Sequence, residues 1–185
     1  MRIIAGTLRS RRLKTVEGEG YRPAMGKVRE SLFSMLSSRL GSFEGLDVLD
    51  LFAGSGSLAF EALSRGASRA WFVETAQNAV RCLSDNIEEL GLTDRAFIVK
   101  ADVLKVVRRV HGAERGMGGL VFLDPPYRRH LAQGALSGLA ECGWLAKGAY
   151  VVMEIEAGLE IDVPASLSID TDKLFGQTRI IMMKN

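Results

Sequence analysis

The stretch that most constrains the fold of this chain runs from Asp47 to Ser57 and reads Asp-Val-Leu-Asp-Leu-Phe-Ala-Gly-Ser-Gly-Ser. A short apolar segment with a carboxylate near its end leads into a Gly-x-Gly turn, after which a helical pattern begins. In α/β proteins, a strand that ends in a glycine-rich turn forms one wall of a ligand pocket at the carboxyl edge of the sheet. The run therefore predicts both a pocket and the sheet that holds it.

Strand-like and helix-like segments alternate after this run, which predicts an α/β, Rossmann-like fold. Two later segments are expected to close the sheet as an antiparallel pair around Gly176. Repeated strand–helix units predict a mostly parallel sheet of seven strands with helices on both faces. The expected strands are 48–52, 69–74, 96–100, 120–123, 149–155, 166–170 and 178–183, and the expected helices are 57–64, 76–90, 103–110 and 131–142.

The first 41 residues are expected to form an extension to a domain over residues 42–185. Residues 2–6 and 12–16 predict a short β-hairpin, and residues 23–40 predict a helix with one buried face. Pro23 suits the first turn of that helix. The remaining glycine-rich segment, 112–119, is expected to be a loop.

Charge is distributed unevenly along the chain. Residues 1–29 hold eight basic and two acidic residues, a net charge of +6, whereas the whole 185-residue chain carries +2, which leaves −4 for the rest. A basic segment on a mildly acidic body indicates contact with a polyanion, although a solvated basic hairpin would show the same charge pattern. The candidate residues for this polyanion contact are Arg2, Arg9, Arg11, Arg12, Lys14, Arg22 and Arg29.

The glycine turn predicts a nucleoside ligand that carries positive charge. Glu74 ends the next expected strand, close to the separation at which an acidic residue binds ribose hydroxyls in Rossmann-type sites. Asp50 precedes the turn, and a carboxylate there would repel a pyrophosphate. S-adenosylmethionine, with its ammonium and sulfonium groups, fits both residues. Asp102 either accepts from the adenine amine or caps the following helix, or does both. The candidate cofactor-binding residues are Asp50, Phe52, Ala53, Gly54, Ser55, Gly56, Glu74, Thr75, Asp102 and Val103.

The segment Asp124-Pro125-Pro126-Tyr127 follows another buried strand and is expected at the same edge of the sheet. Two prolines fix the backbone and remove two N–H donors, so the loop offers mainly acceptors, the Asp124 carboxylate and the Pro125 carbonyl. Such acceptors suit an exocyclic amine, and Tyr127 offers an aromatic face for an extruded base. These four residues are the candidate catalytic residues. Glu154, in the fifth expected strand, has no assigned role.

Several motifs resemble the RsmD family of bacterial 16S rRNA (guanine-N2)-methyltransferases, over nearly the whole chain. They are Arg2 to Gly6, Arg22-Pro23, Val28 to Phe33, Asp50 to Gly56 and Asp124 to Tyr127, together with 61–66 and 143–145. The resemblance implies a class I methyltransferase fold, S-adenosylmethionine bound at Asp50 to Gly56, Glu74 and Asp102, the target amine at Asp124 to Tyr127, and RNA on the basic hairpin. Relatives usually carry Thr or Ser and an acid where this chain has Ala24-Met25-Gly26.

The motif alone leaves alternatives open. Adenine N6 and cytosine N4 also present an N–H pair, so a methyltransferase of another base, in RNA or DNA, fits the same loop. A non-catalytic RNA-binding assembly factor is the other alternative. The sequence has no apolar run long enough to span a membrane and no signal-peptide pattern, so a cytoplasmic location is expected. The expected state is a monomer without a metal, and the resemblance implies 16S rRNA or the small ribosomal subunit as its partner. Two cysteines and two histidines provide too few ligands for a zinc site.

Overall fold

The computed structural model describes residues 1–16, 26–109, 118–126 and 129–185, and structural statements below concern these residues. Five helices and seven strands alternate along the chain in the expected order. The helices are α1 (Gly26–Leu40), α2 (Ser57–Ser64), α3 (Gln77–Leu90), α4 (Val103–Val107) and α5 (Arg129–Glu141), and the strands are β1 (Asp47–Leu51), β2 (Arg69–Glu74), β3 (Ala96–Lys100), β4 (Gly118–Leu123), β5 (Leu145–Glu156), β6 (Ser168–Phe175) and β7 (Thr178–Lys184).

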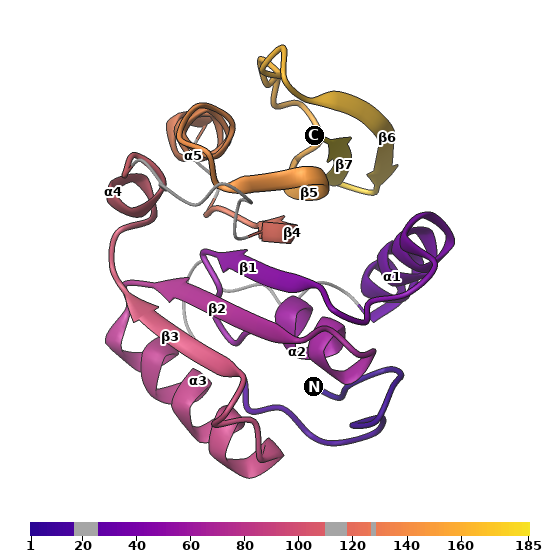
Figure 1. The fold of residues 1–185 in the computed structure, drawn as a ribbon, viewed down its shortest axis with the longest axis vertical. Helices are drawn as coiled ribbons and strands as arrows, with labels where there is room; N and C mark the ends of the chain where they lie inside the picture. The colour runs from indigo at the N-terminus through magenta and orange to yellow at the C-terminus, as the bar shows by residue number, and fades with distance from the viewer. Residues whose placement is uncertain (17–25, 110–117, 127–128) are drawn as a thin grey trace.

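The strands form one seven-stranded sheet in the order β3-β2-β1-β4-β5-β7-β6 (Figure 1). The first five in this order are parallel, whereas β7 pairs antiparallel with both β5 and β6. The mostly parallel seven-stranded sheet predicted from the sequence is confirmed. The strand order reverses between β1 and β4, and ligands of open α/β sheets bind outside the carboxyl ends of the strands at such a point.

Helices cover both faces of the sheet, as predicted (Figure 1). Helices α1, α2 and α3 pack in one buried cluster, to which the strands contribute Val48, Phe122 and Val152. Helices α4 and α5 pack on the other face with the neighbouring strand residues, such as Leu49 and Val121. This strict alternation between faces follows from the two-residue period of a strand, and it fixes the face onto which each carboxylate at the strand ends points.

The predicted N-terminal hairpin pairs over a short length: one antiparallel bridge joins Arg2 and Arg12, and Ile3 N donates to the Arg11 carbonyl oxygen at 3.1 Å. Beyond this pairing the backbone bonds to α2. Glu61, which is fully buried, accepts from Ile4 N at 2.7 Å and from Ala5 N at 3.0 Å. Because these N–H groups are bound to a helix side chain, they are not available for a strand ladder. The residues before α1, 17–25, lie outside the described part of the chain.

Strands β5 and β6 extend beyond their predicted bounds, and the register of each shifts against its neighbour near the predicted end. Strand β5 begins at Leu145 rather than at 149, passing through Gly148, which has φ +77°, while its register with β4 shifts between Gly118 and Leu120. Strand β6 runs to Phe175 rather than to 170, with a shift between Ile169 and Thr171. The shift in β6 adds one residue, as a β-bulge does, and in both strands the pairing resumes beyond the shift.

Candidate functional site

The glycine loop and the Asp124 loop leave the sheet side by side. Strands β1 and β4 are neighbours, and Leu51 pairs with Leu123, so both strands end at the same level of the sheet. Asp124 N lies 3.5 Å from the Leu51 carbonyl oxygen, across the gap between the two strands. Two loops separated by about seventy residues in sequence therefore lie side by side where the strand order reverses, the position at which open α/β sheets bind ligands; this expected ligand position is called the crevice below.

The glycine loop is a tight turn with left-handed backbone at three positions. Phe52 has φ +63°, Gly54 +55° and Gly56 +76°. A Cβ atom added to Gly56 would lie 2.7 Å from side-chain atoms of Leu83 and Phe60, closer than real contacts allow. Glycine at this position therefore lets the turn approach α3 and begin α2 directly. Ala53 and Ser55, also predicted to contact the cofactor, are half-buried at the mouth of the turn.

Glu74, at the end of β2, ties the glycine loop to the start of α3. It is 7% exposed, and its carboxylate accepts from Gly54 N at 3.0 Å, from Thr75 N at 2.6 Å and from Ala76 N at 2.8 Å. The side chain thus lies beside the glycine turn, as its predicted ribose-binding role requires. Thr75 itself is exposed.

Asp50 is buried beneath the glycine loop. It is 2% exposed, and its Oδ2 accepts from Ala59 N in α2 at 3.3 Å. Burial raises the pKa of Asp50 to about 8, while the Ala59 N–H lowers it and the Glu74 carboxylate raises it further. A cation placed beside Asp50 favours the ionised form and lowers that pKa again. The pocket is therefore suited to positive charge.

Asp102 follows β3 and caps α4. Its Oδ1 accepts from Lys105 N at 3.0 Å, so the helix-capping role considered from the sequence is present. The residue is exposed at the carboxyl edge, whereas the adjacent Val103 is buried. A contact between Asp102 and an adenine stays a prediction.

Asp124 lies among other carboxylates. Burial raises the pKa of Asp124 well above its usual range, and the nearby Glu154 and Asp50 carboxylates raise it further. Burial also raises the pKa of Glu154, and Glu154 Oε2 is buried without a hydrogen-bond partner among the described residues. In the same loop Pro125 is buried and Pro126 exposed, and Tyr127 lies outside the described residues. The sequence left Glu154 without a role; a charged residue at the end of an otherwise apolar strand was the available signal.

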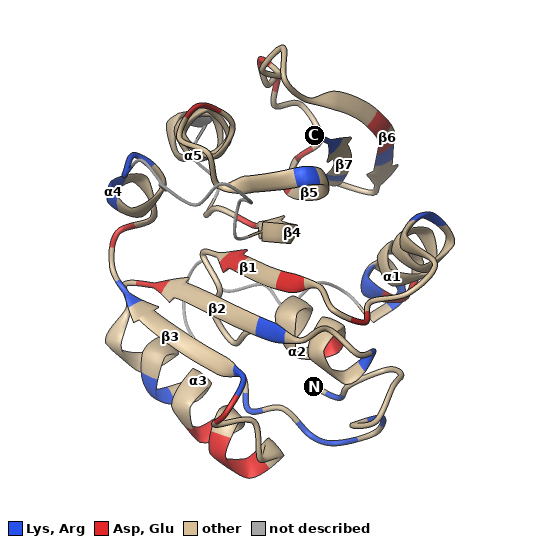
Figure 2. Ribbon diagram, in the orientation of Figure 1, with Lys and Arg blue, Asp and Glu red and all other residues tan. Residues whose placement is uncertain are grey.

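The predicted RNA-binding residues differ in availability. Arg9 and Arg12 are exposed. Arg2 donates to the Ser10 carbonyl oxygen at 2.7 Å, and Arg11 donates to that of Glu89. Lys14 forms ion pairs with Asp85 and Glu89 of α3, where basic and acidic residues face each other (Figure 2).

Arg29 does not fit its predicted RNA contact. It is 4% exposed, and its Nη2 donates to the Arg2 carbonyl oxygen at 2.6 Å. The sequence pattern placed Arg29 next to the buried stripe of α1 but did not show that the N-terminal segment covers it. The remaining candidate, Arg22, lies outside the described residues.

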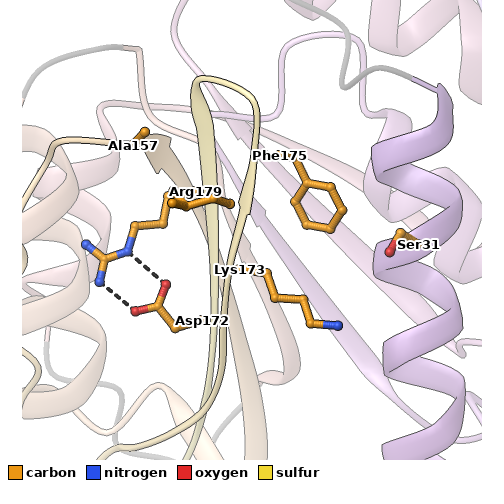
Figure 3. Close-up of a pocket in the computed structure, with 7 residues that line it drawn as sticks. Ser31, Ala157, Asp172, Lys173, Phe175 and Arg179 are labelled. Carbon is orange, nitrogen blue, oxygen red and sulfur yellow. Dashed lines mark hydrogen bonds and ion pairs between the residues drawn. The ribbon is translucent and has the colours of Figure 1, made fainter.

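A groove of about 560 Å³ lies between α1 and the β6–β7 hairpin (Figure 3). Its lining residues include Ser31, Lys173 and Phe175, and Asp172 forms an ion pair with Arg179 at 2.6 Å. Because none of the predicted site residues appears in this lining, the groove is distinct from the crevice between β1 and β4. No cluster of three metal-ligating side chains, and no helix able to cross a membrane, occurs within the described ranges.

Comparison with known proteins identifies relatives over the full chain. Residues 1–184 match the family model described as Conserved hypothetical protein 95. The chain is 37% identical to Ribosomal RNA small subunit methyltransferase D of Escherichia coli K12 over 180 residues, 96% of this chain and 86% of that protein. The protein of the same name from Haemophilus influenzae is 34% identical over 177 residues, 95% and 89% of the two chains.

A solved structure also matches this chain over its full length. The structure of yhhF from Escherichia coli superposes with a TM-score of 0.86 at 33% identity, covering 100% of this chain and 97% of that one. The match therefore includes the carboxyl edge of the sheet and both loops that flank the crevice. The chain belongs to the Conserved hypothetical protein 95 family, the RsmD family that its motifs resemble.

Proposed function

We propose that this protein transfers a methyl group from S-adenosylmethionine to the exocyclic N2 amine of a guanine in 16S ribosomal RNA. The observation that carries the proposal is the pairing of two loops in one crevice: a glycine turn over buried Asp50 and an Asp-Pro-Pro loop one strand away. The relatives that match nearly the whole chain are named as methyltransferases of small-subunit ribosomal RNA.

The residues of the pocket fit S-adenosylmethionine. Core side chains fill the space that a side chain at Gly56 would need, so glycine lets the turn pack closely on the core and begin α2 at the edge of the sheet. Glu74 lies beside the turn to accept from ribose hydroxyls, and Asp102 lies at the neighbouring strand end. Buried Asp50 favours the cationic end of the ligand. When bound, S-adenosylmethionine supplies a methyl group on a positively charged sulfur, and S-adenosylhomocysteine is the product.

The role of Asp124 is to hold the amine. Its carboxylate and the Pro125 carbonyl accept the two N–H groups of N2, which directs the nitrogen lone pair out of the base plane. Holding the nitrogen in line in this way supplies most of the rate by positioning. The carboxylate also stabilises the positive charge that develops on nitrogen, and it lies ready to take the proton that nitrogen then releases. Tyr127 would stack on the extruded base.

RNA contact at the N-terminal segment requires a large substrate. The segment lies along α3, with Arg11 bonded near the carboxyl end of that helix and Val16 packed against Ala79 near its start. Fourteen residues of helix are about 21 Å long, so Arg9 and Arg12 lie roughly that far from the catalytic crevice. We infer that a structured segment of 16S rRNA, in the free RNA or in a small subunit, spans this distance on a cytoplasmic, metal-free monomer.

The test is methyl transfer from labelled S-adenosylmethionine to ribosomal RNA from cells that lack this protein. Nucleoside mapping is expected to find N2-methylguanosine at one position of 16S rRNA. Label on adenine or cytosine would replace the guanine assignment, and an unlabelled RNA with retained RNA binding would indicate a non-catalytic assembly factor. RNA from cells that contain the protein is the control, because its target position is already methylated.

A further inference from the structure

Glu154 and Asp124 occupy neighbouring positions at the ends of adjacent strands. On the adjacent strands β4 and β5, Leu123 pairs with Met153, so the next residue on each chain is Asp124 and Glu154. Neighbouring strands are about 4.8 Å apart, which places the two backbones within reach of one base. Both positions continue the alternation that points Phe122 and Val152 toward α1. The two carboxylates therefore share one side of the carboxyl edge.

The Glu154 side chain has an unmet hydrogen-bond acceptor. Its Oε2 is buried and has no partner among the described residues. A buried polar atom without a partner carries a desolvation cost, which natural structures retain mainly at sites with a functional role. Strand β5 places this acceptor beside the loop that holds the target amine. Because the Glu154 carboxylate also raises the pKa of Asp124, the two side chains lie close together, and the unmet acceptor lies near the loop that would hold the base.

On the basis of the proposed methyl transfer, we propose that Glu154 binds the N1–H of the target guanine while Asp124 holds its N2 amine. Guanine presents N1–H and the N2 amine side by side, two adjacent donors for two adjacent carboxylates. Adenine and cytosine present an amine beside a ring nitrogen that accepts, so an ionised Glu154 opposes both. Extruded bases are read through this Watson–Crick edge. Glu154 is then the residue that selects guanine.

The electrostatics of the Asp124–Glu154 pair agree with this assignment. Burial raises the pKa of Glu154, and burial with the Glu154 carboxylate raises that of Asp124, so the pair favours holding a proton before the base arrives. The charged groups that act on this pair are Asp50, below the glycine loop, and the two carboxylates themselves. Two N–H donors from guanine favour the ionised forms. Guanine binding is therefore accompanied by proton release.

The test compares Glu154→Gln with the wild-type protein on two RNAs. A synthetic copy of the methylated segment, assembled into small subunits, carries either guanine or 2-aminopurine at the mapped position. 2-Aminopurine keeps the 2-amine but has an accepting N1. Leaving a buried acceptor unpaired costs about 1–3 kcal/mol, so the wild type is expected to favour guanine by about 10–100-fold in kcat/KM. A glutamine amide can donate to N1, so the variant should reduce this ratio toward one.

Two further variants control the experiment. Glu156→Gln changes an exposed residue on the same strand and should leave the ratio unchanged. Glu154→Asp retains the carboxylate and should retain the preference for guanine with lower kcat/KM, which tests the inference if the glutamine variant fails to fold. An unchanged guanine preference in folded Glu154→Gln would overturn the role of Glu154 while leaving the proposed function intact. Failure of the wild type to methylate guanine N2 would overturn both.

Discussion

At the scale of single residues, the carboxylates at the sheet edge determine what this site can do. Asp50, Asp124 and Glu154 are drawn from three neighbouring strands and have raised pKa values because burial disfavours their charged forms. In the proposed reaction, the cationic methyl donor offsets the desolvation cost of Asp50, and the N–H groups of the base offset that of Asp124 and Glu154. The same residues therefore lower the stability of the empty protein and provide the binding energy of the loaded one.

Replacing Asp124 with asparagine tests its role in catalysis. The amide is nearly the same size but provides a weaker acceptor and no charge, so kcat is expected to fall about 100–1,000-fold. S-adenosylmethionine binding, measured by calorimetry, should change little, because the cofactor pocket lies on the β1 side of the crevice. Full activity in a folded variant would exclude the proposed mechanism.

Replacing Asp50 with asparagine tests its buried charge through pH. The carboxyl group ionises near its usual value, about 4, in the unfolded chain and at about 8 in the folded protein. Between these values the folded state holds a proton that the unfolded state lacks, so the free energy of unfolding falls as pH rises across this window. The contribution of Asp50 is at most about 1.4 kcal/mol per pH unit.

Urea unfolding of Asp50→Asn between pH 5 and about 8 should therefore give a flatter profile than the wild type, with a stability gain that grows with pH. Asp94→Asn, at an exposed residue remote from the crevice, is the control and should follow the wild type. Parallel profiles for wild type and Asp50→Asn would show that Asp50 is ionised in the folded protein.

At the scale of elements, two glycine-containing turns with similar backbone carry different constraints. Gly56, before α2, has φ +76° and is closely surrounded by Leu83, Phe60 and Phe72. Gly176, in the β6–β7 turn, has φ +65° but no atom within 4 Å of an added Cβ. A side chain at Gly56 is therefore disfavoured by backbone strain and by packing, whereas a side chain at Gly176 is disfavoured by backbone strain alone.

Alanine substitution separates these two terms. Gly176→Ala should lower the free energy of unfolding by about 1–2 kcal/mol, the cost of a left-handed backbone with a side chain. Gly56→Ala adds overpacking, typically about 1–3 kcal/mol more. Chemical unfolding of both variants measures the difference. An equal decrease in the free energy of unfolding of both variants would show that the core around Gly56 rearranges freely. It would also contradict the inference that packing limits the glycine loop.

The sequence predicted the bounds of an element well where neighbouring residues alone mark its ends. The bounds of β2 and β3 agree with the predicted residues, because polar and turn residues flank short apolar runs. The predicted bounds differ from the structure where contacts between distant residues decide the pairing. Strand β5 continues through Gly148 to Leu145, before its predicted start at 149, and Ile4 and Ala5 bond to Glu61, fifty-seven and fifty-six residues away, so the hairpin pairing stays short.

At the scale of the whole molecule, the exposed arginines of the N-terminal segment and the crevice lie apart. Hydrogen bonds to α2 and packing of Ile3 and Leu13 in the main core hold the segment against the helices that cover the sheet. Its exposed arginines lie near the carboxyl end of α3, at the edge of the sheet opposite the crevice. An RNA that reaches both must be structured over this distance, which favours recognition of shape as well as of one base.

Replacing Arg9 and Arg12 together with alanine should weaken RNA binding and reduce its dependence on salt. Each lost phosphate contact reduces the slope of log K against log salt by about 0.7–0.9. Binding to 16S rRNA at several salt concentrations measures this slope. Lys147→Ala removes an exposed cation at the start of β5 and provides the control. A slope unchanged in the double variant would remove the N-terminal segment from the RNA interface.

The sequence by itself determined the alternation of strands and helices, the glycine turn after the first strand and the acceptor loop after the fourth, because each depends on neighbouring residues. The tertiary structure decided what these parts could do together. Strands β1, β4 and β5 are adjacent only in the folded sheet, so the proximity of Asp50, Asp124 and Glu154 could not be read from their spacing. The burial of Arg29 was decided in the same way, because residues far along the chain determine which surfaces remain in water.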